Sequence, residues 1–262
     1  MKKHLKIFAC YFRLNLSSAL EYRASFLMQV FGMALSNSSF IFFWWVAFGQ
    51  LGGHIAGYSF EDVMFIWACA SASFGLSHVL FANVSSLSRM IISGELDTFL
   101  LQPCNMLLNV LCAKTELFAY GDLAYGIVLM ALTQGASASA WLWFLVSMIL
   151  GGALMCAVTL CAHTLTFYLG DASLIGSMVS EFLVNFSIYP ETIYGPFMRA
   201  VMYTIIPAGF IVHIPLRLAR GFNPWLALGL LAAAATYCAF SAWFFYRGLR
   251  RYESGNVIVT RE

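Results

Sequence analysis

Long hydrophobic stretches, separated by short polar segments, dominate the sequence. An α-helix needs about 20 predominantly apolar residues to cross a bilayer. Six stretches of roughly this length follow one another, at residues 24–48, 63–84, 117–134, 140–168, 172–189 and 225–246. They predict an all-α integral membrane protein with six transmembrane helices.

Residues 1–23 precede the first stretch and interleave Lys and Arg with aromatic and aliphatic residues at roughly helical spacing. This pattern suits an amphipathic helix lying in the lipid headgroup layer. A plain basic tail that sets the topology fits equally well. The segment lacks a signal-peptide cleavage pattern, and the apolar run after it is too long for a signal peptide, so we expect that run to remain as the first span.

Residues 190–222, between the fifth and sixth stretches, are irregular. Their apolar part, residues 201–216, is only 16 residues long and is interrupted by Pro207 and Pro215. A segment this short and broken predicts an extracellular re-entrant or interfacial hairpin rather than a seventh span.

Residues 88–105 form a charged connection after the second stretch. Apolar residues at helical spacing lie on both sides of Gly94, and Pro103 follows them. The charged residues are Arg89, Glu95 and Asp97, and the apolar ones are Leu87, Met90, Ile91, Leu96, Phe99 and Leu100. Apolar side chains beside acidic ones predict a small docking helix with a polar rim. A surface helix lying on lipid is the alternative, and residues 105–116 either continue this helix or begin the third span.

Composition supports the membrane class. Of 262 residues, 61% are hydrophobic and 10% charged, whereas a soluble domain is about half apolar and about a quarter charged. We therefore expect one membrane domain over residues 1–262, in contact with membrane lipids. The net charge of +2 is too small to predict a nucleic-acid partner. The seven Cys, odd in number and without a C-x-x-C pair, predict reduced thiols.

The distribution of Lys and Arg predicts the orientation. If both termini are cytoplasmic, ten of these residues lie inside: five before the first span, Arg89, and four after the last span. Three lie outside, namely Arg199, Arg217 and Arg220. This asymmetry obeys the positive-inside rule. It also predicts that residues 88–105 lie in the cytoplasm.

Catalytic and metal-binding motifs are missing from the sequence. It contains no P-loop, no H-E-x-x-H helix, no G-x-S-x-G turn and no His and Cys at metal-ligand spacing. We expect no catalytic residue, no metal site and no cofactor bound by this chain. His78 and His163 lie within predicted spans, where polar side chains commonly form hydrogen bonds between helices. We expect such bonds for both.

The fifth stretch contains the best candidates for a transport pathway or a subunit contact. Ser177, Glu181 and Asn185 are four residues apart and therefore share one helix face. An acidic residue at mid-membrane is costly and seldom faces lipid. Glu181 should face a cavity, a partner subunit or a neutralising neighbour; a protonated Glu held between helices is the alternative. Asp122 in the third stretch has the same two interpretations.

Four segments, in chain order, resemble a known family. They read Ile-Ser-Gly-Glu-Leu-Asp-Thr-Phe-Leu-Leu-Gln-Pro at 92–103, Tyr-Pro at 189–190, Ile-Ile-Pro at 205–207 and Gly-Leu-Arg-Arg-Tyr-Glu-Ser at 248–254. Together they look like the ABC-2 family of ABC exporter permeases. More closely, they resemble its six-span bacterial branch, long known as a domain of unknown function.

The resemblance implies a permease subunit without its own ATPase site, and so not an enzyme. It would work with two copies of an ABC ATPase, which bind ATP and Mg, and with a second permease chain, identical or different. The cargo would be an amphipathic or lipid-like molecule, a drug or a peptide, exported across the bacterial plasma membrane. The loop after span two would be a coupling helix that docks on the ATPase. The corresponding residues are Gly94, Glu95, Leu96, Asp97, Leu100 and Pro103, to which we add Arg89 of the same segment.

Two other classes of protein fit the composition. A membrane-embedded enzyme would use Glu181, Asp122, His163 or His78 as acid or base, although these residues show no catalytic spacing. A membrane scaffold or immunity partner that transports nothing is the second.

Overall fold

The computed structural model describes residues 2–21, 23–50, 52, 54–55, 57–102, 104–135 and 137–253, and only the backbone of residues 2–7 and 19. The first elements are α1 (Lys2–Glu21), α2 (Arg23–Gln50), β1 (His54–Ile55), β2 (Tyr58–Ser59) and α3 (Phe60–Phe81). Between α3 and α7 lie the 3-10 helix η1 (Ala82–Ser86), α4 (Leu87–Ser93), α5 (Asp97–Leu100) and α6 (Met106–Cys112). Then follow α7 (Phe118–Gln134), α8 (Ala138–Thr164), α9 (Thr166–Leu169) and α10 (Ser173–Ile188). The last are the 3-10 helix η2 (Glu191–Ile193), α11 (Pro196–Thr204), the π-helix η3 (Gly209–His213), α12 (Ile214–Arg220) and α13 (Pro224–Leu249).

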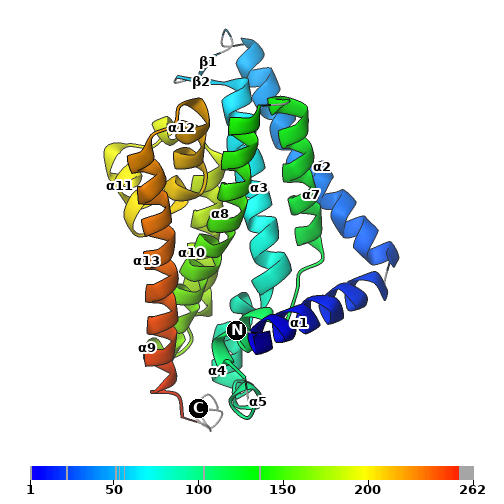
Figure 1. Cartoon of the computed structure of the whole chain (residues 1–262), viewed down its shortest axis with the longest axis vertical. Helices are drawn as coiled ribbons and strands as arrows, with labels where there is room; N and C mark the ends of the chain where they lie inside the picture. Colours follow the sequence, from blue (N-terminus) through cyan, green and yellow to red (C-terminus); the bar gives the residue numbers. More distant parts are fainter. Residues whose placement is uncertain are drawn as a thin grey trace.

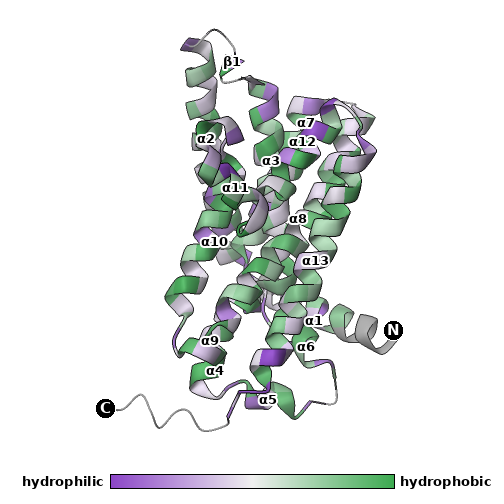
Figure 2. Ribbon diagram, turned by 90° about the vertical axis from the view of Figure 1, so that its left-hand side faces the viewer, coloured by the Kyte–Doolittle hydropathy of each residue, from purple (hydrophilic) through white to green (hydrophobic). Residues whose placement is uncertain are grey.

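The long helices form an elongated bundle with α3 and α8 at its centre (Figure 1). Helix α7 packs on α3, helices α10 and α13 pack on α8, and α2 lies on the outside against α7. Hydrophobic residues cover most of the helices along their length, as Figure 2 shows, and hydrophilic residues are more frequent near the two ends. The prediction of an all-α membrane protein is confirmed.

Each of the six predicted spans coincides with a helix, but the helices differ in length. Among the described residues, four segments are long and apolar enough to cross a membrane, namely Arg23–Gln50, Phe60–Ser93, Ala138–Leu169 and Pro224–Leu249. A fifth crossing arises only if the bent pair Pro196–Thr204 and Gly209–Arg220 counts as one span. Helices α7 and α10 have 17 and 16 residues, or about 25 Å of helix against a hydrocarbon core of about 30 Å. The number of crossings and the orientation stay predictions.

Helix α3 contacts both of its neighbours at glycines. A Cβ added at Gly75 would lie 2.5 Å from the backbone nitrogen of Leu123 in α7, and one at Gly126 would lie 2.7 Å from the carbonyl oxygen of Ala68. On the α8 side, a Cβ at Gly151 would lie 2.5 Å from Ser73 Oγ. In lipid, helices associate through close packing of small residues rather than through the hydrophobic effect. These glycines therefore hold the centre of the bundle together.

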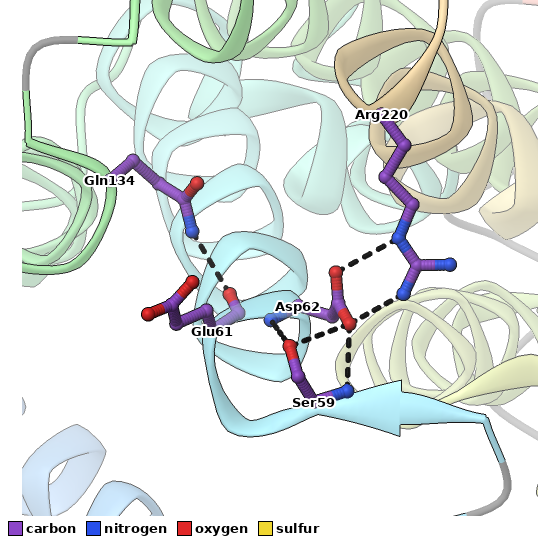
Figure 3. A network of polar contacts seen from close by, with 5 residues as sticks. All are labelled: Ser59, Glu61, Asp62, Gln134 and Arg220. Atoms are coloured by element: carbon purple, nitrogen blue, oxygen red, sulfur yellow. Dashed lines mark hydrogen bonds and ion pairs between the residues drawn. The ribbon is translucent and has the colours of Figure 1, made fainter. Parts of the chain in front are cut away.

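A network of polar contacts joins three helices at the end of the bundle where α3 begins (Figure 3). Ser59 and Asp62 form a capping box at the start of α3. Asp62 also pairs with Arg220 at the end of α12, with Nη2–Oδ2 and Nε–Oδ1 distances of 2.5 and 2.9 Å. Gln134 at the end of α7 donates to the carbonyl oxygen of Glu61 at 3.1 Å. The network fixes the register of α3 relative to α7 and α12.

The segment predicted as a re-entrant hairpin is a bent pair of helices, with an angle of 82° between α11 and the helix formed by η3 and α12. Glu191 joins the two arms, because it accepts hydrogen bonds from Tyr203 Oη at 2.6 Å and from Arg217. Sequence analysis had not singled out this carboxylate. Whether the pair enters the membrane from the outer side stays a prediction.

Helix α1 lies across the opposite end of the bundle (Figure 1). Its Phe8 ring lies 6.4 Å from that of Phe81, and Asn15 Nδ2 donates to the carbonyl oxygen of Cys112 at 3.1 Å. Leu14 and Leu20 are exposed. A helix across the bundle with exposed leucines agrees with the interfacial helix expected for residues 1–23; its place in the headgroup layer stays a prediction.

Residues 105–116 neither continue the surface helix nor begin the third span. They contain the separate helix α6, which Asn105 caps by accepting a hydrogen bond from the backbone N–H of Leu108 at 3.0 Å. Residues 113–117 are not helical.

A glycine inside the contact between α3 and α7 and a glycine outside it should respond differently to a larger side chain. Gly126→Leu should lower the free energy of unfolding by about 1–3 kcal/mol, because overpacking forces the backbones apart. Gly229→Leu in α13 should have little effect, because nothing lies within 4 Å of its added Cβ. Thermal unfolding of the purified protein in detergent measures both. Equal losses for the two variants would contradict the proposed contact.

Glu191 predicts a pH-dependent stability. Burial by itself raises the pKa of Glu191, but the hydrogen bonds from Tyr203 and Arg217 outweigh it and leave the pKa below its usual value. The ionised form therefore stabilises the fold at pH values above the usual pKa of a glutamate, about 4.3. This contribution disappears as the pH falls through the lowered pKa of Glu191 in the folded state. Glu191→Gln should cost about 1–3 kcal/mol at pH 7 and progressively less below about pH 4.3. Glu61→Gln, at an exposed carboxylate of the same end, is the control and should cost little at either pH.

Candidate functional site

The connection after α3 folds back onto the bundle through its apolar residues. Leu87, Met90 and Ile91 of α4 are buried in a cluster with Val110 of α6, Leu160 of α8 and Phe245 of α13. Gly94 then ends α4 with φ +76°, a conformation that glycine adopts without steric cost. After this turn the backbone N–H of Leu96 donates to the carbonyl oxygen of Met90 at 3.2 Å. The turn therefore holds α5 beneath the bundle, as Figure 1 shows.

The residues predicted to contact an ATPase have different environments. Arg89 and Glu95 are exposed, and so is Leu100. Leu96, in contrast, is 0% exposed and belongs to the buried cluster. Its role is to hold the element on the bundle, so Leu96 cannot serve as a direct contact in this conformation. Pro103 lies outside the described residues.

Asp97 interacts within the chain. It lies beside Tyr252, which follows α13, and burial together with the Asp97 carboxylate raises the pKa of Tyr252 to about 12. Because of this contact, a change at Asp97 would disturb the chain itself as well as any docking surface.

Leu101 is the residue of this element that sequence analysis missed. Its side chain is 86% exposed, more than that of Leu100 at 48%. Helical spacing gave no signal for it, because it lies just after the four-residue helix α5. Arg89, Glu95 and Leu100 are also exposed, and we call these four residues the tip.

A buried chain of hydrogen bonds links α4 to the membrane helices. Ser88 Oγ and His163 Nδ1 of α8 are 2.8 Å apart, and Thr166 Oγ1 of α9 donates to Ser88 Oγ at 2.8 Å. On its other side the His163 ring touches α10, where a Cβ added at Gly176 would lie 2.4 Å from Cε1. The expected interhelical bond is thus confirmed for His163. His78 instead bonds to the carbonyl oxygen of Phe74 in its own helix.

The three polar residues of α10 share an exposed face, as predicted from their spacing. Ser177, Glu181 and Asn185 are all exposed and line one surface groove with His78 and His163. An exposed carboxylate on an apolar helix is unfavourable against lipid. This face therefore requires water or another protein chain beside it.

Asp122 lies next to this groove but is buried. It lines a cavity of about 260 Å³ between α2, α3, α7, α8 and α10. Phe74, Val184 and Asn185 line both this cavity and the groove. The structure thus brings all four candidate pathway residues into adjoining spaces.

In the described part of the chain, no group of three or more His, Cys, Asp or Glu could hold a metal ion.

Comparison with known proteins defines the class. A family profile described as "ABC-2 family transporter protein" matches residues 35–255. The chain belongs to this family. No curated protein matches the sequence.

This family membership agrees with the architecture. Members of the ABC-2 family are membrane domains of transporters, typically without a catalytic site of their own, and normally work with an ABC ATPase. The match begins within α2 and ends after α13, so it includes the tip, the groove and every lining residue of the cavity except Met33.

The two leucines at the turn should respond differently to truncation. Leu96→Ala should lower the free energy of unfolding by about 2–5 kcal/mol, because it opens a cavity in the core. Leu101→Ala should change it by no more than about 0.5 kcal/mol, as expected for an exposed side chain. Thermal unfolding in detergent distinguishes them. A large loss for Leu101→Ala would mean that this side chain packs within the chain.

Proposed function

We propose that this ABC-2 family protein is the transmembrane subunit of an ATP-driven exporter, and that its tip docks on a separate ABC ATPase. The observation that carries the proposal is the conformation of the tip. Leu100 and Leu101 expose apolar surface, Arg89 and Glu95 of the same connection are exposed too, and the buried Leu96 holds the turn on the bundle. Apolar centres with polar rims are typical of protein interfaces.

The hydrogen bonds behind the tip provide a route for coupling. Movement of α4 would act through Ser88 on His163 and, through the contact of its ring with Gly176, on α10. Helix α10 borders both the groove and the cavity. ATP binding by the docked ATPase would move the tip and switch the helices between inward-open and outward-open states, and hydrolysis would reset them.

A second permease chain would cover the exposed polar face of α10. Glu181 and its neighbours are unsuited to lipid, and α2 is likewise largely exposed. The complete exporter would then contain two permease chains, identical or different, and two ATPase subunits that bind ATP and Mg. The cargo would be an amphipathic or lipid-like molecule, a drug or a peptide.

We place the protein in the bacterial plasma membrane with both termini in the cytoplasm. Helix α1, the tip and the end of α13 lie at the same end of the bundle (Figure 1), which supports a common side for them. The basic residues near both chain ends favour the cytoplasm for that side.

Docking through the tip predicts the loss of a bound ATPase when Leu101 is truncated. The tagged chain, expressed with its neighbouring genes and extracted in mild detergent, should retain an ATPase. Leu101→Ala should reduce the retained amount at least about fivefold, because apolar anchors carry much of the energy of an interface. The matched control is Leu132→Ala, a change at a leucine of α7 that is 78% exposed and lies near the other end of the bundle.

The outcomes separate the proposal from its alternatives. If the folded chain retains no ATPase, or if both variants retain it equally, docking through the tip is wrong. Enzymatic activity in a preparation without any ATPase would favour a membrane enzyme. Full function after Glu181→Leu would favour a scaffold.

A further inference from the structure

The cavity beside Asp122 has the composition of a binding site. Its volume of about 260 Å³ lies just below the usual range of small-molecule sites, about 300–1,000 Å³. Its lining is mostly aromatic, aliphatic and methionine side chains, and among the described residues that line it none is Lys, Arg or His. The cavity therefore has one acidic group and no basic group to balance it.

Asp122 carries a buried oxygen that has no hydrogen-bond partner among the described residues. The residue is only 3% exposed. Its Oδ1 accepts a hydrogen bond from Asn37 Nδ2 of α2 at 2.7 Å, whereas Oδ2 has no hydrogen-bond partner among the described residues. Ser71 Oγ donates to the backbone oxygen of Asp122 at 2.8 Å. A buried carboxylate is costly unless it is paired or neutralised.

Aromatic rings stand beside this carboxylate. Phe40 and Trp67 both line the cavity, with ring centroids 4.9 Å apart. Phe74 lines it at the border with the α10 groove. The face of an aromatic ring attracts a cation, most strongly where water is excluded. A carboxylate among aromatic rings thus favours a ligand that is both positively charged and apolar.

We propose that this cavity binds an organic cation with an apolar body, either a small one or the cationic end of a larger molecule. The positive charge of the cation lies on the Asp122 side of the cavity, and the rings of Phe40, Trp67 and Phe74 line the space for its apolar part. It enters from the α10 groove, where Glu181 provides a second carboxylate. That this cation is the cargo rests on the proposed export function, whereas binding itself does not.

Binding can be measured on the full chain alone in lipid nanodiscs. The probes are benzyltrimethylammonium and neopentylbenzene, which have the same shape and differ by the charge. Equilibrium dialysis against loaded and empty nanodiscs removes the contribution of partitioning into lipid. We expect the cation to bind at least about tenfold more tightly than its neutral counterpart, as desolvated ionic and cation–π contacts predict.

Two variants make the test specific. Asp122→Asn keeps the shape of the side chain and should abolish the preference for the cation. Val184→Phe fills part of the cavity that Val184 lines and should reduce the equilibrium binding of both probes without changing the carboxylate. Thermal unfolding verifies that both variants fold.

Two results would overturn the proposal: equal affinities of the unaltered chain for both probes, or a preference that survives Asp122→Asn. Either would mean that the Asp122 carboxylate does not select the cation. Because no ATPase is present, these results are independent of docking at the tip. Conversely, if the chain binds the cation but retains no ATPase in the co-purification experiment, the binding site is supported and the export function is rejected.

Discussion

The close contact of α3 with α7 and α8 is the constraint on which the rest of the structure depends. In lipid, apolar side chains gain nothing from leaving the surrounding hydrocarbon, so helices must associate through close backbone approach and hydrogen bonds. Gly75, Gly126 and Gly151 allow that approach on both sides of α3. As a result α3 is the most buried of the long apolar helices. The position of α3 therefore sets where the polar network at its start and the connection after its end lie.

Polar contacts connect separate helices at three levels of the bundle. At one end Asp62 joins α3 to α12 through Arg220. In the middle Asp122 joins α7 to α2 through Asn37. At the other end Ser88 joins α4 to α8 through His163. Because an unsatisfied polar group in hydrocarbon is costly, such contacts fix which helix faces which.

The proposed docking, coupling and binding steps occupy successive levels of this frame. Helix α5 lies beneath the bundle (Figure 1), Ser88 of α4 bonds to His163 of α8, and His163 lines the groove that adjoins the cavity. The turn at Gly94 gives the tip its shape, since it buries Leu96 and leaves Leu101 facing outward. A rigid connection of this kind is suited to passing movement from one end to the pathway helices.

The sequence by itself determined the class of protein, the position of six helices, the turn at Gly94 and the shared face of Ser177, Glu181 and Asn185. These follow from hydrophobicity, helical spacing and the conformational freedom of glycine, which are properties of short segments. Only the tertiary structure decided that Leu96 is buried while Leu101 is exposed, that Glu191 meets Arg217, and that Asp122 borders a cavity shared with Asn185. Each of these outcomes depends on contacts between residues that other helices bring together, and spacing along one segment does not determine which helices become neighbours.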